Sequence, residues 1–73
     1  MKILIVEPDR NILNSLSRYF VSSNNEVQKA FDGVIALNEF DDDTSVLFID
    51  GVLPRITSDD VIRKLKMKKP NLK

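Results

Sequence analysis

The sequence contains no cysteine and no histidine among its 73 residues. Without cysteine there is no disulfide, no thiolate zinc site and no thiol nucleophile. Without histidine there is no imidazole general base, no Ser-His-Asp triad and no imidazole ligand of the kind that most often binds transition metals. Any chemistry must therefore use carboxylates, amines, hydroxyls or main-chain groups.

Glycine is also scarce, and long apolar runs are missing. The two glycines, Gly33 and Gly51, are isolated, which excludes glycine-rich phosphate loops and dinucleotide fingerprints. No apolar run approaches the roughly 18 residues of a membrane span. The run Ile3–Val6 is too short for the core of a signal peptide. We therefore expect a cytoplasmic protein with no membrane segment.

The length allows one small domain, residues 1–73, whose core is marginal because such a domain buries only about 60% of its unfolded surface. The 11 basic and 11 acidic side chains give a net charge of zero but are unevenly distributed. Acids dominate residues 1–54 and bases dominate residues 55–73. The acidic part could hold a cation and the basic end could meet an anion, but each is equally explained as a solvated surface.

Three segments have the patterns of strands. Ile3–Val6 and Val46–Ile49 are continuous apolar runs, which are typical of central strands buried on both faces. Glu26–Phe31 mixes polar and apolar residues and predicts a wetter edge strand.

Three further segments predict helices, at residues 10–21, 34–40 and 57–69. In the first, Ile12, Leu16 and Phe20 recur every four residues and predict the buried face. Asp9 precedes the first helix and Thr57 begins the third, and both are residue types that cap helices. The acidic run Asp41–Asp43 is interpreted as an exposed loop rather than a metal site.

Strands and helices therefore alternate, which predicts an α/β fold with a parallel sheet covered by helices. If the strand order is 2-1-3, the first and third strands are neighbours. Glu7 and Asp50, which directly follow these strands, would then face each other at the carboxyl edge of the sheet. In open α/β sheets, binding sites form at this edge.

Two carboxylates held close together need a counter-charge. Mg²⁺ suits such a pair, because it takes one or two carboxylates together with water and phosphate oxygens. A carboxylate beside Mg²⁺ can attack phosphorus and form an acyl phosphate. The simpler alternative is that each acid only caps the turn after its strand, and the spacing by itself favours this alternative.

Four segments together resemble the receiver domain of two-component response regulators. They are Ile3–Glu7, Ala30–Gly33 followed by Ala36-Leu37, Val46–Asp50, and Leu53-Pro54. The match covers the whole chain, and its joint spacing is more specific than any single segment. The resemblance implies a flavodoxin-like parallel sheet with strand order 2-1-3-4-5, of which this chain supplies the first three βα units in the order 2-1-3.

The resemblance also implies a function and a site. Asp50 matches the phosphoacceptor, which receives a phosphoryl group from a histidine kinase or phosphotransfer protein before the domain switches conformation or partner. Glu7, Asp50 and the backbone carbonyl of Val52 match the groups that hold Mg²⁺, and Asp9 is a further candidate ligand. On this interpretation the chain is a signalling protein and not an enzyme.

Three departures from the family pattern are present. Pro8 stands where the family has its second acid, and Ser58 stands where a glycine is usual. The fold is also incomplete relative to the five-stranded receiver, whose last two βα units carry a Ser/Thr and a Lys that bind the phosphoryl oxygens. These departures favour an alternative function, a degenerate or truncated receiver-like module that acts by protein–protein pairing without phosphorylation.

A three-stranded sheet leaves strand 46–50 at an edge, where unpaired main-chain groups attract another strand. We therefore expect a homodimer or a completing partner segment at this strand, and a fragment of a longer regulator is the third explanation. The basic stretch Arg63–Lys69 has no interleaved aromatic residue and no recognition motif, so we expect no direct nucleic-acid binding.

Overall fold

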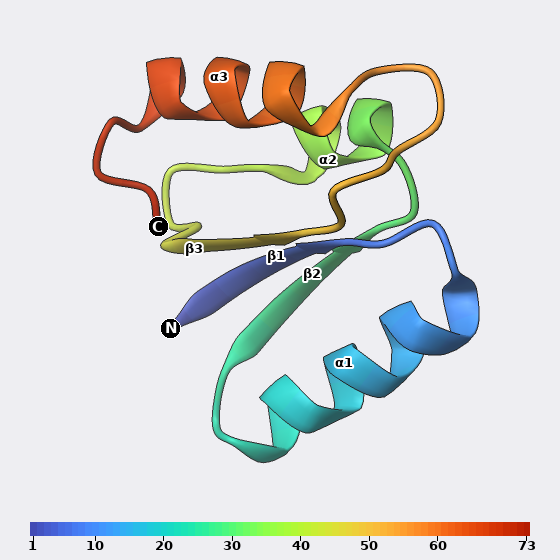
Figure 1. Cartoon of the computed structure of the whole chain (residues 1–73). Helices are drawn as coiled ribbons and strands as arrows, with labels where there is room; N and C mark the ends of the chain where they lie inside the picture. Colours follow the sequence, from blue (N-terminus) through green and yellow to red (C-terminus); the bar gives the residue numbers. More distant parts are fainter.

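The computed structural model describes all 73 residues and contains a three-stranded parallel sheet and three helices (Figure 1). The elements are β1 (Lys2–Val6), α1 (Arg10–Ser22), β2 (Glu26–Ala30), α2 (Gly33–Glu39), β3 (Val46–Ile49) and α3 (Ser58–Lys68). The sheet order is β2-β1-β3. The predicted α/β fold and strand order are confirmed. No helix has the length and apolar character that crossing a membrane requires.

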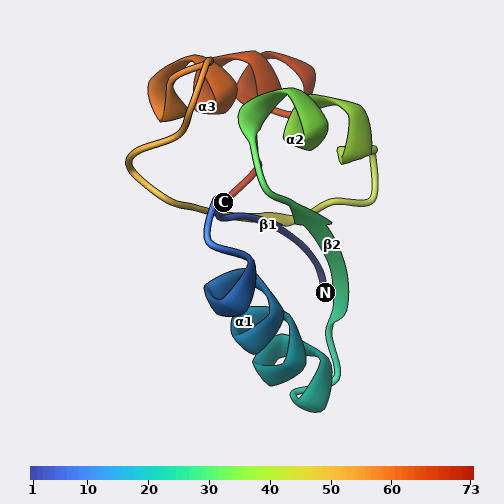
Figure 2. The ribbon, with the colours of Figure 1, turned by 90° about the vertical axis from the view of Figure 1, so that its right-hand side faces the viewer.

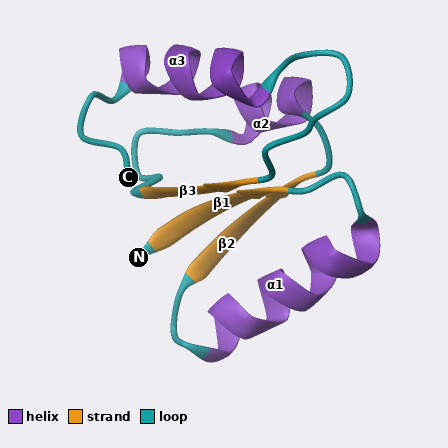
Figure 3. Ribbon diagram, in the orientation of Figure 1, coloured by secondary structure: helices purple, strands orange, loops and turns teal.

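The sheet lies between two helical layers. Helix α1 covers one face, and α2 and α3 lie together on the other (Figures 2 and 3). Alternate residues of β1 point to opposite layers. Ile3 and Ile5 pack with Leu13 of α1, whereas Leu4 and Val6 belong to the larger cluster with α2 and α3. Strand β1 is therefore the strand that is buried on both faces.

The buried face of α1 differs from the predicted one. Ile12 is 48% exposed, whereas Leu13 is buried against β1. Leu16 and Phe20 pack beside Leu13, as predicted for these two positions. Spacings of three and four residues both fit one helical face. The rotation of α1 about its axis is therefore decided by its docking on the sheet.

The apolar run of β3 is typical of a central strand, but β3 lies at the sheet edge, as expected for three strands in the order 2-1-3. Its side chains are only partly covered, and Phe48 is 44% exposed. The edge is not entirely bare, however. The N–H of Lys73 donates to the carbonyl of Ser45 at 3.3 Å, and the N–H of Leu47 donates to the carbonyl of Lys73 at 3.2 Å. Lys73 thus pairs with the start of β3 in the pattern of a parallel strand.

Candidate functional site

Glu7 and Asp50 follow adjacent strands at the same edge of the sheet. Val6 of β1 and Ile49 of β3 are paired in register, and the N–H of Asp50 donates to the Val6 carbonyl at 2.9 Å. Paired strands lie about 4.8 Å apart, so the main chains of Glu7 and Asp50 are neighbours. Both residues are half-buried. The predicted juxtaposition of these two positions is therefore present in the fold.

The other two predicted Mg²⁺ ligands, Asp9 and the Val52 carbonyl, differ in whether they already accept hydrogen bonds within the chain. The Asp9 Oδ1 caps α1 by accepting from the N–H groups of Asn11 and Ile12, at 2.9 and 3.2 Å. The predicted capping role of Asp9 is thereby confirmed. Val52 is 81% exposed, and no hydrogen bond to its carbonyl is formed within the chain.

The carboxylates of Glu7 and Asp50 remain largely available. One oxygen of Glu7 accepts the Asp9 N–H at 3.0 Å, and the Asp50 carboxylate forms no hydrogen bond or ion pair within the chain. No three acidic side chains are placed so that together they could hold a metal ion. Two carboxylates and a carbonyl fit the ligand set of Mg²⁺, which usually keeps several waters. The surface around them is open, and no pocket forms.

The main chain of Asp50 is held on its other side by a serine. The Ser58 hydroxyl, at the start of α3, donates to the Asp50 carbonyl at 2.5 Å. Ser58 is buried, with 7% of its surface exposed. The sequence pattern did not indicate this contact, because a serine at a helix start is typical of capping.

Two arginines lie near the same edge, and both are engaged. Arg55, in the loop between β3 and α3, has a left-handed backbone with a φ of 67° and forms an ion pair with Asp32. Arg10, at the start of α1, lies over the Phe31 ring with its guanidinium carbon 4.4 Å from the ring centroid. Such stacking stabilises the cation at the ring face. Neither contact was predicted from the sequence.

Asp32 is the most deeply buried acid of the chain, with 2% of its surface exposed. Its Oδ1 caps α2 by accepting the Ile35 N–H at 2.9 Å, and its Oδ2 accepts from Arg55. The pKa of this carboxyl is lowered from its ordinary value, first by the Ile35 hydrogen bond and then by Arg55, against the opposing effect of burial. Asp32 therefore remains charged and fixes the start of α2 to the loop after Asp50.

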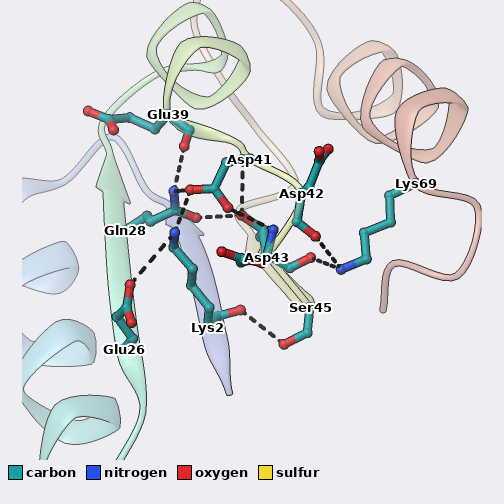
Figure 4. A network of polar contacts seen from close by, with 10 residues as sticks. Lys2, Glu26, Gln28, Glu39, Asp41, Asp42, Asp43, Ser45 and Lys69 are labelled. Carbon is teal, nitrogen blue, oxygen red and sulfur yellow. Dashed lines mark hydrogen bonds and ion pairs between the residues drawn. The ribbon is translucent and has the colours of Figure 1, made fainter.

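A second polar cluster lies at the opposite, amino end of the strands (Figure 4). Lys2 forms ion pairs with Asp41 and Glu26, and the Lys69 ammonium donates to the carbonyls of Asp42 and Thr44 at 3.0 and 2.7 Å. Thr44 is fully buried. The acidic loop is exposed as predicted, but Asp41 and the main chain of the loop are also bound to the ends of β1 and α3. This cluster is structural and is separate from Glu7 and Asp50.

No family model matches the sequence. A protein of Haloferax volcanii, whose name proposes a role as a transcriptional regulator, is 27% identical over 64 residues, which are 88% of this chain and 11% of that protein. Solved structures match between 88% and 99% of this chain.

Three solved structures illustrate the similarity. The non-phosphorylated HemR receiver domain from Leptospira biflexa matches 97% of this chain with a TM-score of 0.91 and 22% identity. The BeF3-activated DrrB receiver domain matches 96% with a TM-score of 0.84 and 27% identity. A complex of the histidine kinase ThkA with the response regulator TrrA matches 99% with a TM-score of 0.87 and 26% identity. This chain spans 58%, 58% and 63% of those chains, respectively.

The fold is therefore that of a response regulator receiver domain, and the resemblance seen in the sequence is confirmed. The chain comprises three parallel βα units in the order β2-β1-β3 and is incomplete relative to the domains it matches. These similarities support a role in two-component signalling.

Proposed function

We propose that this chain is a cytoplasmic receiver module that accepts a phosphoryl group on Asp50 from a histidine kinase or phosphotransfer protein. The observation that carries the proposal is the placement of Glu7 and Asp50 after two strands that are paired in register. The Asp50 carboxylate has no partner within the chain, which leaves it available as a nucleophile. The match to a response regulator solved with a histidine kinase supports this choice of partner.

The proposed reaction transfers a phosphoryl group between two protein side chains. A carboxylate oxygen of Asp50 attacks the phosphorus of a phosphohistidine, the P–N bond breaks, and an acyl phosphate forms. The electron pair of the broken bond returns to the imidazole of the partner, which then takes up a proton. The open surface around Asp50 allows a protein donor to approach.

Glu7, Asp50 and the carbonyl of Val52 would hold Mg²⁺ at this site. When bound, Mg²⁺ neutralises the charge of the phosphoryl oxygens and so allows an anionic carboxylate to approach phosphorus. Pro8 contributes no carboxylate and Asp9 caps α1, so Glu7 and Asp50 would supply the acidic ligands. A match to a BeF3-activated receiver domain is in keeping with a phosphoryl-binding role.

The proposal is tested by incubating the folded chain with acetyl phosphate and Mg²⁺ and measuring its intact mass. We expect one phosphoryl adduct, which is lost in Asp50→Asn and retained in Asp43→Asn, a matched change in the exposed loop at the other end of the sheet. Glu7→Gln should raise the Mg²⁺ concentration needed for the reaction. A folded wild-type chain that forms no adduct would refute phosphotransfer by this chain.

The second candidate function is pairing with another protein or a second copy through β3, without phosphorylation. It is favoured by the edge position of β3, by the 44% exposure of Phe48 and by the lack of a third carboxylate placed to bind a metal ion together with Glu7 and Asp50. Sedimentation over a range of concentrations tests it. If the chain pairs through this strand, we expect a dimer that Phe48→Lys weakens. Met67→Lys, at an exposed position of α3, should leave the dimer unchanged. A monomer at the highest concentration argues against self-pairing.

A further inference from the structure

The main-chain groups on both sides of the Asp50 Cα are fixed by hydrogen bonds to different elements. Its N–H donates to the Val6 carbonyl of β1 at 2.9 Å, and its carbonyl accepts from the Ser58 hydroxyl of α3 at 2.5 Å. Together these bonds restrict both backbone dihedrals of Asp50. The carboxylate then moves only through its own side-chain torsions.

The first of these bonds continues the regular ladder between β1 and β3. The second is not part of any regular element, because a side-chain hydroxyl reaches from the first residue of α3 to the end of the neighbouring strand. Ser58 is itself well fixed. Its helix is anchored in the core by Val61 and Leu65, both fully buried, and only 7% of Ser58 is exposed.

Ser58 is not needed to cap its own helix. Thr57 occupies the N-cap position, and its hydroxyl accepts the Asp60 N–H at 3.2 Å. The Ser58 hydroxyl is thus left for the Asp50 carbonyl. Without the Ser58 hydroxyl, Asp50 and the start of α3 would be connected only through the intervening loop, with no hydrogen bond between them.

We infer that Ser58 is a positioning residue for the carboxylate of Asp50, acting by holding the Asp50 main chain at the place where phosphorus is attacked. This inference rests on the proposed phosphotransfer function. Small displacements of a reacting group are costly, since a shift of about 1 Å can lower a rate about 100-fold. Removing one hydrogen bond allows a smaller displacement, and we expect Ser58→Ala to lower the maximal rate of phosphorylation about five- to tenfold.

The test compares wild type, Ser58→Ala and Ser58→Thr with Ser45→Ala in phosphorylation by acetyl phosphate at saturating Mg²⁺. Ser45 is a matched control, because its hydroxyl also donates to a main-chain carbonyl, that of Lys2 at 3.2 Å, but at the opposite end of the sheet. The expected result is a lower maximal rate in Ser58→Ala with an unchanged half-saturating concentration of acetyl phosphate. Ser58→Thr should restore the rate, and Ser45→Ala should keep it.

A second measurement does not depend on phosphorylation. The ¹³C chemical shift of the Asp50 carbonyl reports its hydrogen bond, and we expect it to change in Ser58→Ala and to return toward the wild-type value in Ser58→Thr. An unchanged shift in Ser58→Ala would overturn the inference by itself. So would equal rates in Ser58→Ala and Ser45→Ala when the wild type is phosphorylated. If the folded wild type takes up no phosphoryl group, the proposed function is wrong. The positioning role is then wrong as well, even if the Asp50 carbonyl shift shows that the Ser58 hydrogen bond is present.

Discussion

Gly33 lies so close to Ile56 that a Cβ at Gly33 would be 2.3 Å from the Ile56 Cγ2. The same Cβ would be 2.7 Å from the Cγ2 of Val61, which is fully buried in α3. Gly33 is the first residue of α2, so this contact sets how closely α2 approaches α3 and the loop before it. The requirement for glycine here is spatial, since the φ of Gly33 is not positive.

Gly33→Ala should therefore destabilise the fold, although alanine favours helices. Overpacking of this kind costs about 1–3 kcal/mol in the free energy of unfolding. Gly51→Ala is the matched control, because a Cβ there meets nothing within 4 Å, and we expect a change within about 0.5 kcal/mol. Urea denaturation of both variants measures the difference. Equal stabilities would show that α2 and α3 adjust freely.

The burial of Leu13 and the exposure of Ile12 predict unequal effects of neighbouring substitutions in α1. Leu13→Ala should lower the free energy of unfolding by about 2–4 kcal/mol, because a cavity remains between α1 and β1. Ile12→Ala should change it by less than about 1 kcal/mol. Urea denaturation checks both, and the reverse order would mean that α1 docks through the face that the sequence periodicity alone predicts.

The lowered pKa of the Asp32 carboxyl leads us to expect that the stability of the fold decreases at acidic pH. Its pKa in the folded chain is lowered, chiefly by the Ile35 N–H and also by Arg55, from an ordinary value of 3.8. The charged form therefore stabilises the fold fully above that value, and this contribution is lost as the pH falls through the lower folded pKa. Thermal unfolding should show falling stability below about pH 4.

Asp32→Asn should be less stable than wild type at pH 7 and should lose less stability on acidification. Asp59→Asn, an exposed change in the first turn of α3, serves as the control and should keep the wild-type acid profile. The same loss of stability in wild type and Asp32→Asn between pH 5 and pH 2 would remove Asp32 as its source.

Substitution of Lys69 is expected to loosen the loop at the amino end of the sheet. Its ammonium donates to the carbonyls of Asp42 and Thr44, and hydrogen bonds from charged groups contribute about 1.5–3 kcal/mol. We discount that range because Lys69 is only partly buried, and expect Lys69→Met to cost about 1 kcal/mol. The Thr44 N–H, which donates to Asp41 at 3.1 Å, should exchange with solvent faster in Lys69→Met than in Lys68→Met, an exposed neighbouring change. Equal exchange would show that Lys69 does not hold the loop.

Most of the secondary structure was predictable because its signals are local. The apolar run of β1, the caps Asp9 and Thr57 and the break at Pro70 each act within a few residues, and the structure places the elements accordingly. The order of strands and helices limited the topology to few choices. The placement of Glu7 and Asp50 at one sheet edge followed from that topology. Their roles in phosphotransfer and Mg²⁺ binding stay predictions.

The exposed side of α1 was not predictable in this way, and the apolar pattern of Val46–Ile49 alone did not indicate an edge strand. An apolar run such as Val46–Ile49 has the same pattern whether the strand becomes central or lies at an edge, because position in a sheet depends on which other strands are present. Likewise, Ile12 and Leu13 have similar hydrophobicity, and only the docking angle of α1 decides which of them is buried.

The sequence by itself determined the alternation of strands and helices, the two acids after β1 and β3, and the exclusion of thiol and imidazole chemistry. Only the tertiary structure decided that Ser58 bonds to Asp50, that Arg55 pairs with Asp32, that Gly33 must be small and that Lys73 pairs with β3. The physical reason is range. Periodicity and capping act between near neighbours in the chain, whereas these contacts join different elements and exist only once the helices pack on the sheet.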